Sequence, residues 1–112
     1  MGGKNQLGQS KVIMRLNKIE ELFAEKALIK SNIFLLASND AVDFINESQR
    51  KNIKILGVDV FYLIQEKIRP TMEKSIDFTS RSYVEKNISN YDVARTIIEN
   101  ARDLYFEIVI DC

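Results

Sequence analysis

The longest apolar run of the chain covers residues 53–64 and is rich in β-branched and aromatic residues. This composition predicts a strand, or two strand segments separated at Gly57, because glycine adopts backbone angles that other residues avoid. The run is continuous and not alternating, so we expect both faces of the strand to be covered for part of its length. Asp59 is its only acid, and a buried acid needs solvent, a partner or a chemical role.

The region before this run has helical periodicity in two places. Apolar residues recur three and four positions apart from residue 11 to about residue 30, which predicts one helix. The apolar segment 33–36 is too short to assign by its period. Residues 38–52 predict a second helix that Ser38 or Asn39 can cap.

The region after the apolar run has the features of a hairpin. Gln65-Glu66 is the expected turn, although it lacks the glycine that tight hairpin turns prefer. Residues 67–69 would return as a strand, and Pro70, the only proline, would end that strand or place it at a sheet edge. Residues 76–79 alternate weakly and predict a third short strand.

The last third of the chain predicts a short helical turn over residues 83–88 and a longer helix beginning at Asn90. The end of the chain is ambiguous, because residues 106–110 have strand composition while their apolar positions also continue the helical stripe. We expect the helix to continue to about residue 106, with Tyr105 on its apolar stripe. A final strand is the alternative.

Together these elements predict an α+β fold of two layers. A small antiparallel sheet with a central hairpin would pack against three to four helices. The 112 residues, 46% of them apolar, suit one domain that buries a core without disulfides or metals. We expect residues 1–10 to be a flexible tail, since three of the four glycines lie there, and residues 11–112 to form the single domain.

The residue types that are missing narrow the chemistry. The chain has no histidine and one cysteine, Cys112, which excludes an imidazole base, a Ser-His-Asp triad and an internal disulfide and leaves zinc without a ligand set. The glycines lack the spacing of a phosphate-binding loop. We therefore expect no catalytic residue, no metal and no cofactor. An enzyme would have to use carboxylates, lysine or tyrosine, for example the carboxylate cluster of Asp40, Asp43 and Glu47.

The amino-acid composition also indicates where in the cell the protein is expected. No stretch approaches the roughly 20 apolar residues of a membrane helix, and the amino terminus lacks an apolar signal core. A chain without an internal disulfide suits a reducing compartment. We therefore expect a cytoplasmic protein that does not bind membranes.

The net charge is zero but its distribution is uneven. Residues 1–30 carry six basic and three acidic residues, while residues 71–112 carry five basic and eight acidic residues. A nucleic-acid binder would usually show a stronger basic excess, so we expect no direct contact with nucleic acid. The carboxyl-terminal third is the expected site for a cationic partner.

The tyrosines lie in or beside the apolar run and the acidic third. Tyrosine is favoured at interfaces because it combines apolar area with a polar tip. For Tyr62 and Tyr83 an interface position and the edge of the core are equally open alternatives. Tyr105 is better explained by the core.

One combination of motifs adds a family resemblance. An Ile-Leu-Gly-Val-Asp-Val strand at residues 55–60, an Ile-Arg-Pro at residues 68–70 and a helix near Tyr91 to Tyr105 follow one another. Over about residues 33–105 this order resembles an immunity family of bacterial polymorphic toxin systems, the family numbered forty. Val58 stands where that family has a second glycine, and the chain has no tryptophan where the family has one after the proline.

The resemblance implies a non-enzymatic protein of contact-dependent growth inhibition. Such a protein binds and neutralises a cognate toxin domain, often a nuclease, by steric and electrostatic blocking. The toxin-binding residues would then be Tyr62, Glu73, Asp77, Tyr83, Tyr91 and Asp92. The motif residues Gly57, Asp59 and Pro70 would be structural, with Asp59 accepting backbone hydrogen bonds at a bend made by Gly57.

Two other functions stay open. One is an adaptor domain that self-associates through a tyrosine-bearing sheet edge, and the other is a carboxylate-dependent hydrolase. Whether the protein is a monomer or a homodimer is equally undecided.

Overall fold

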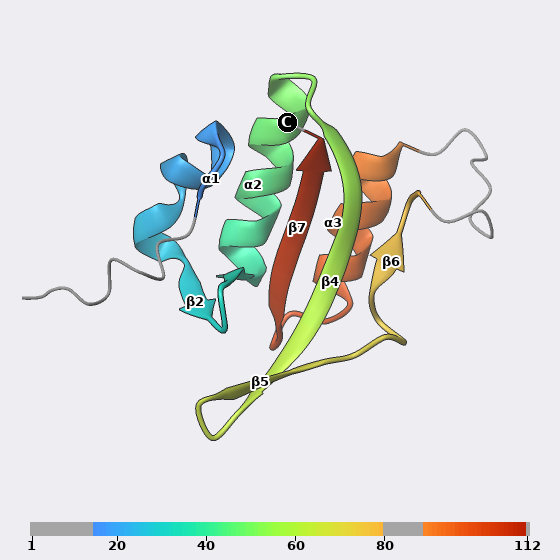
Figure 1. Cartoon of the computed structure of the whole chain (residues 1–112). Coiled ribbons are helices and arrows are strands. Elements are labelled where there is room, and N and C mark those ends of the chain that lie inside the picture. The colour runs from blue at the N-terminus through green and yellow to red at the C-terminus, as the bar shows by residue number, and fades with distance from the viewer. Residues whose placement is uncertain (1–14, 80–88, 112) are drawn as a thin grey trace, which may run out of the picture.

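The computed structural model describes residues 15–79 and 89–111, which form one antiparallel sheet backed by helices (Figure 1). The elements are, in chain order, α1 (Lys18–Leu22), the 3₁₀ helix η2 (Ala24–Lys26), β2 (Leu28–Lys30), β3 (Ile33–Ala37), α2 (Ser38–Arg50), β4 (Lys54–Ile64), β5 (Lys67–Pro70), β6 (Ile76–Asp77), α3 (Asn90–Glu99) and β7 (Tyr105–Asp111). The predicted tail 1–10, the helical turn 83–88 and Tyr83 lie outside the described residues.

The sheet is centred on β4 and β7. Its strand order is β2-β3-β7-β4-β5, and β6 pairs with β4 beyond the end of β5. The register between β4 and β7 runs from Lys54 opposite Asp111 to Phe61 opposite Tyr105. The predicted central strand and its hairpin are thereby confirmed, with Pro70 at the end of an edge strand.

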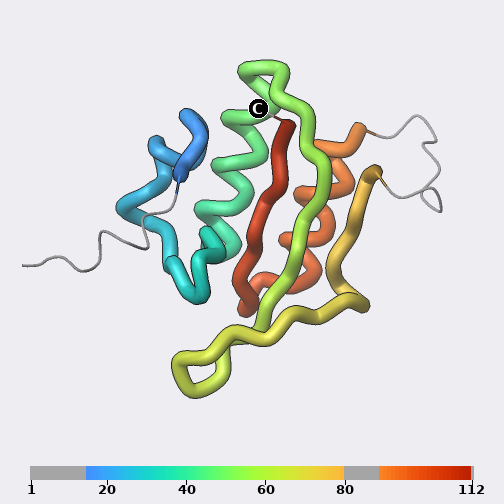
Figure 2. Tube along the Cα trace, viewed as in Figure 1, coloured from blue at the N-terminus to red at the C-terminus, as the bar shows by residue number. Residues whose placement is uncertain are grey.

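The sheet is larger and more curved than predicted. It is a six-stranded half-barrel with three α-helices among the described residues, not a small sheet packed against three to four helices. Lys30 Nζ in the edge strand β2 lies 3.1 Å from the Oε1 of Glu66 in the hairpin turn. The edge strand β2 and the β4–β5 hairpin at the opposite edge of the sheet therefore approach each other. Figure 2 shows the hairpin below β2.

Helices α2 and α3 cover one face of the sheet, and α1 packs against α2. The rings of Phe23 and Phe44 meet at 5.3 Å between centroids where η2 begins. The core lies between the helices and the sheet, and its fully buried members include Phe44, Ile45, Ala94, Ile98, Val58, Val60 and Phe106. Within the described ranges, no helix has the length and apolar character needed to cross a membrane.

The first predicted helix is wrong at both ends among the described residues, because residues 15–17 are not helical and α1 covers Lys18–Leu22 only. Asn17 caps α1 through a reciprocal pair of hydrogen bonds with Glu20, at 2.7 and 3.0 Å. The helix ends at Leu22, and β2 follows. Ser31 and Asn32 both have positive φ, 51° and 64°, which turns the chain into a hairpin with β3.

Two further predictions need correction. Helix α2 is confirmed, but its N-cap is Ala37, which makes no side-chain cap hydrogen bond, and Ser38 is the first helical residue. The last helix ends at Glu99, and the alternative of a final strand is the correct one, so Tyr105 begins β7 and does not lie on a helical stripe. Pairing with β3 and β4 on its two sides outweighs the helical period of the local sequence.

Candidate functional site

The two central strands present two different faces. Successive side chains of a strand point to opposite sides, and Val58, Val60 and Phe106 belong to the core under α2 and α3. Asp59 and Glu107 lie opposite each other across the two strands and therefore point the other way. We call this side the open face; on the central strands it comprises Gly57, Asp59, Phe61, Tyr105, Glu107 and Val109.

Not all side chains on the open face are accessible to solvent. Leu35 is fully buried and Phe61 is 6% exposed, yet neither belongs to the core under the helices. Leu35 lies opposite Leu28, and Phe61 lies opposite Tyr105. Both side chains are therefore buried on the side of the sheet away from the helices, while Val109 on the same side is 38% exposed.

A cavity of about 400 Å³ hollows the open face, beside the place where β6 joins β4. Its lining residues are Leu56, Gly57, Asp59, Met72, Ile76, Asp77, Thr79 and Val109. Four of these side chains are apolar and two are carboxylates. Such a lining suits a ligand that is itself partly apolar and carries positive charge.

Asp59 and Glu107 form an acid pair next to this cavity. Partial burial is the main cause that raises the pKa of Glu107, to about 7, and the charge of Asp59, a hydrogen bond with Asp59 and the charge of Glu20 in α1 add to it. Because two carboxyls at hydrogen-bond distance do not both ionise easily, Glu107 keeps a proton up to near-neutral pH. Within the described ranges Asp59 is thus bonded to Glu107, not to the backbone at a bend as predicted.

Gly57 allows β6 to approach β4. A Cβ atom at this position would lie 2.9 Å from the carbonyl oxygen of Ile76, closer than real contacts permit. Its φ is outside the left-handed region, so close approach and not an unusual backbone angle requires the glycine. The irregularity lies at Leu56, the extra residue of a bulge, whose carbonyl accepts a hydrogen bond of 2.9 Å from Phe78 N.

A serine hydroxyl holds the segment between β5 and β6. Ser75 Oγ accepts a hydrogen bond from Val60 N at 2.9 Å and donates one to Thr71 O at 2.8 Å. Thr71 N in turn donates to Val60 O at 2.9 Å. The hydroxyl therefore replaces a strand partner, and residues 72–74 project from the edge. Met72, 82% exposed, is consequently at the rim of the cavity.

Of the predicted binding residues that the structure describes, Asp77 lines this cavity. Its Oδ1 accepts hydrogen bonds from Thr79 N at 2.9 Å and Thr79 Oγ1 at 2.6 Å, which lower the pKa of Asp77. Glu73 is on the projecting turn and lines a separate hollow with Lys74 and α3 residues. Tyr62, 39% exposed, lies opposite Arg69 in the hairpin.

The other two described candidates are engaged in the fold. The hydroxyl of Tyr91 donates to Ile53 O at 2.8 Å. Asp92 pairs with Arg95 at 2.7 Å, and Arg95 also binds Asn46 and Gln49 of α2. These contacts join α3 to α2 and to the residue before β4, and the described members of the predicted set do not form one continuous site.

Glu107, Val109 and Met72 are site residues that the sequence prediction missed. The helix predicted through residue 106 removed the first two from any sheet. If a final strand is assumed, Phe106 and Ile108 alternate with Glu107 and Val109. This alternation would have placed Glu107 and Val109 on the face opposite the core.

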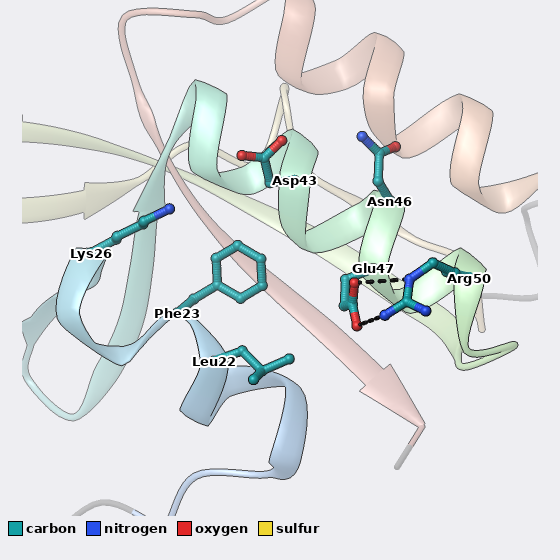
Figure 3. A pocket seen from close by; sticks show the side chains of 7 residues that line it. All are labelled: Leu22, Phe23, Lys26, Asp43, Asn46, Glu47 and Arg50. Atoms are coloured by element: carbon teal, nitrogen blue, oxygen red, sulfur yellow. Dashed lines mark hydrogen bonds and ion pairs between the residues drawn. The ribbon is translucent and has the colours of Figure 1, made fainter.

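A second cavity, of about 450 Å³, lies between α1 and α2 (Figure 3). It is lined by Leu22, Phe23, Lys26, Asp43, Asn46, Glu47 and Arg50. Glu47 accepts two hydrogen bonds from Arg50, at 3.2 and 2.5 Å, and these lower its pKa. Within the described ranges, no group of three or more acids and cysteines is arranged to hold a metal ion, so the cluster with Asp40 and Asp43 does not form one.

Comparisons with known proteins do not assign a family. No protein-family model matches the chain, and neither does any curated protein. The open face and the residue pattern of β4 are therefore the observations that bear on function.

Proposed function

We propose that this protein is an immunity protein that binds a cognate toxin domain through the open face of its sheet. The observation that carries the proposal is the composition of that face, where Asp59, Glu107 and Asp77 lie beside the exposed apolar side chains of Val109 and Met72. An apolar contact area with charges of one sign suits a basic partner, and it speeds and orients association. A nuclease presents a basic surface of this kind, because it binds the phosphates of its substrate.

The proposed interface keeps part of the predicted residue set. Asp77 lies within it, while Glu73 and Tyr62 flank it on the projecting turn and the hairpin. Tyr91 and Asp92 are left out, because their polar atoms already bond within the fold. The inhibitor would work by covering the toxin's basic surface and needs no chemistry of its own.

The architecture favours this role. The open face is built on β4 and β7, which pair over most of the length of β7. A surface fixed by a central strand pair loses little conformational freedom on binding, so more of the contact energy remains as affinity.

The proposal predicts that a toxin domain is encoded beside the gene of this chain, and the test is co-expression of the two proteins. We expect restored growth and a complex that survives size-exclusion chromatography. Val109→Arg, which places a like charge against a basic partner, should abolish both. Ile29→Arg is the matched control, since Ile29 is also an exposed strand residue but lies on β2. Wild-type protein that neither protects nor binds would sink the proposal.

A carboxylate-dependent hydrolase is the second candidate, favoured by one observation. Asp59 and Glu107 are hydrogen-bonded, and Asp59 lines a cavity. Two carboxyls that share a proton can act as general acid and base. Turnover of ester, peptide or glycoside substrates by the wild type, lost in Glu107→Gln with the fold retained, would favour this candidate over the first.

A further inference from the structure

Three cavities lined by described residues differ in how their acidic residues are balanced by basic ones. The cavity between α1 and α2 contains Arg50 and Lys26 together with Glu47 and Asp43, and the hollow at α3 contains Lys74 together with Glu73. The cavity on the open face contains two carboxylates, and no basic residue is among the described residues that line it. Among residues 15–79 and 89–111, these two carboxylates therefore have no positive counterpart in the cavity lining.

The carboxylates of this cavity are held in fixed positions. Thr79 binds Oδ1 of Asp77 twice, and the other oxygen, Oδ2, has no hydrogen bond among residues 15–79 and 89–111. Asp59 is fixed from the opposite side by the cross-strand hydrogen bond with Glu107. Both acids line one hollow, because Gly57 of β4 lies directly opposite Asp77 and lets β6 approach the strand that carries Asp59.

The remaining walls are apolar. Val109, 38% exposed, and Met72, 82% exposed, stand at the opening with Leu56 and Ile76. Lysine and arginine combine an aliphatic stem with a charged end, and they bury the stem against apolar surface while the charge meets its partner. A flexible methionine adapts to such a stem.

We propose that the cavity is the seat of one cationic side chain of the partner, an arginine or lysine, which pairs with Asp59 and Asp77 while its stem lies between Met72 and Val109. This inference rests on the proposed function for the identity of the partner, but not for the existence of the seat. An arginine suits it better than a lysine, because the planar guanidinium can donate to two carboxylates at once.

The test uses n-butylguanidinium, which is an arginine side chain without its backbone. Titrated into ¹⁵N-labelled protein, it should shift the amide signals of Gly57, Asp59, Asp77 and Val109 in a saturable manner. The uncharged isostere n-butylurea should not. Asp59→Asn should weaken binding by about tenfold, as expected for the loss of a charge-assisted hydrogen bond in a partly desolvated hollow.

Asp77→Asn is the second variant and should weaken binding severalfold. Asp43→Asn, in the cavity between α1 and α2, should leave the dissociation constant unchanged. The ¹⁵N spectrum of each variant shows at once whether it is folded. Equal shifts with n-butylurea, shifts spread over other acidic surfaces, or binding that ignores both Asp59→Asn and Asp77→Asn would overturn the seat.

The two proposals fail in different ways. If n-butylguanidinium binds as expected but the toxin domain does not, the seat stands and the immunity function falls. If the toxin domain binds with equal affinity to the wild type and to Asp59→Asn/Asp77→Asn, the immunity function stands and the seat falls.

Discussion

The two faces of β4 and β7 are built from the same strands but follow different physical rules. On the helix side Val58, Val60 and Phe106 are all fully buried. On the open side Asp59 faces Glu107 directly. When both carboxyls are ionised, such a pair of like charges destabilises an antiparallel sheet, whereas aliphatic and aromatic pairs stabilise it.

This difference separates stability from binding. The helix side stabilises the fold, since it removes Val58, Val60 and Phe106 completely from water. The open side costs stability at the acid pair and leaves apolar side chains exposed, so folding does not explain it. A surface that is unfavourable for the isolated protein but complementary to a basic partner is what a binding role requires.

The largest expected effect is on the helix side, whose side chains should contribute more to the free energy of unfolding than those of the open face. Phe106→Ala removes a fully buried ring and should lower the free energy of unfolding by about 3–5 kcal/mol. Val109→Ala, three residues along the same strand but on the open face, should cost less than about 1 kcal/mol. Urea unfolding followed by circular dichroism measures both values. Similar losses in the two variants would mean that the faces are energetically alike.

The next largest effect is expected at Gly57, where β6 meets the edge of the open face. Gly57→Ala places a methyl group 2.9 Å from the carbonyl oxygen of Ile76 and should cost about 2–3 kcal/mol, because a backbone atom must move. Hydrogen exchange should accelerate at Phe78, whose amide bonds to Leu56 O, while Ile98 in α3 stays protected. Unchanged exchange at Phe78 would contradict the close approach.

The helix side was largely predictable from the sequence, because side chains buried on one face recur at regular spacings along a helix or strand. The run at 53–64 predicted β4, and the spacing of Ala41, Phe44 and Ile45 predicted α2. The period failed where strand and helix positions coincide. Ile108 continues a helical stripe and also alternates with Glu107, and only the pairing of β7 with β3 and β4 decides between the two.

The open face was not predictable, because its residues are brought together by register and not by spacing. Asp59 and Glu107 are 48 positions apart, and nothing local links them. Asp77 could be chosen as an acid near the strand, but its place in the cavity depends on the missing Cβ of Gly57. Tyr91 and Asp92 were chosen for residue type and for their place in the acidic carboxyl-terminal third. Their bonds within the fold are set by α2 and by the residue before β4.

A smaller effect should sharpen the boundary of the open face at the projecting turn. Ser75→Ala removes the hydroxyl that binds Val60 N and leaves a buried donor without its partner, at a cost of about 1–2 kcal/mol. Ser75→Thr keeps the hydroxyl and should recover most of the loss. If urea unfolding shows both variants equally destabilised, packing and not the hydrogen bond holds the turn.

The smallest effect is a pH dependence confined to the open face. Folding raises the pKa of Glu107 from 4.5 to about 7, so the folded protein binds a proton more tightly than the unfolded chain in this range. The contribution of this group to stability is therefore fully favourable below pH 4.5 and declines as the pH rises to about 7, after which it is constant. Since Glu107 is partly solvated, we expect a decline of about 1 kcal/mol, less than the full shift would give.

The variant Glu107→Gln tests this pH dependence. Its side chain cannot ionise, so the decline should disappear and the variant should be more stable than the wild type at pH 8. Glu73→Gln on the exposed turn is the control and should retain the decline. Urea unfolding at intervals between pH 4 and pH 8 measures the difference, and a wild-type slope that persists in Glu107→Gln would place the titration elsewhere and remove the energetic distinction between the two faces.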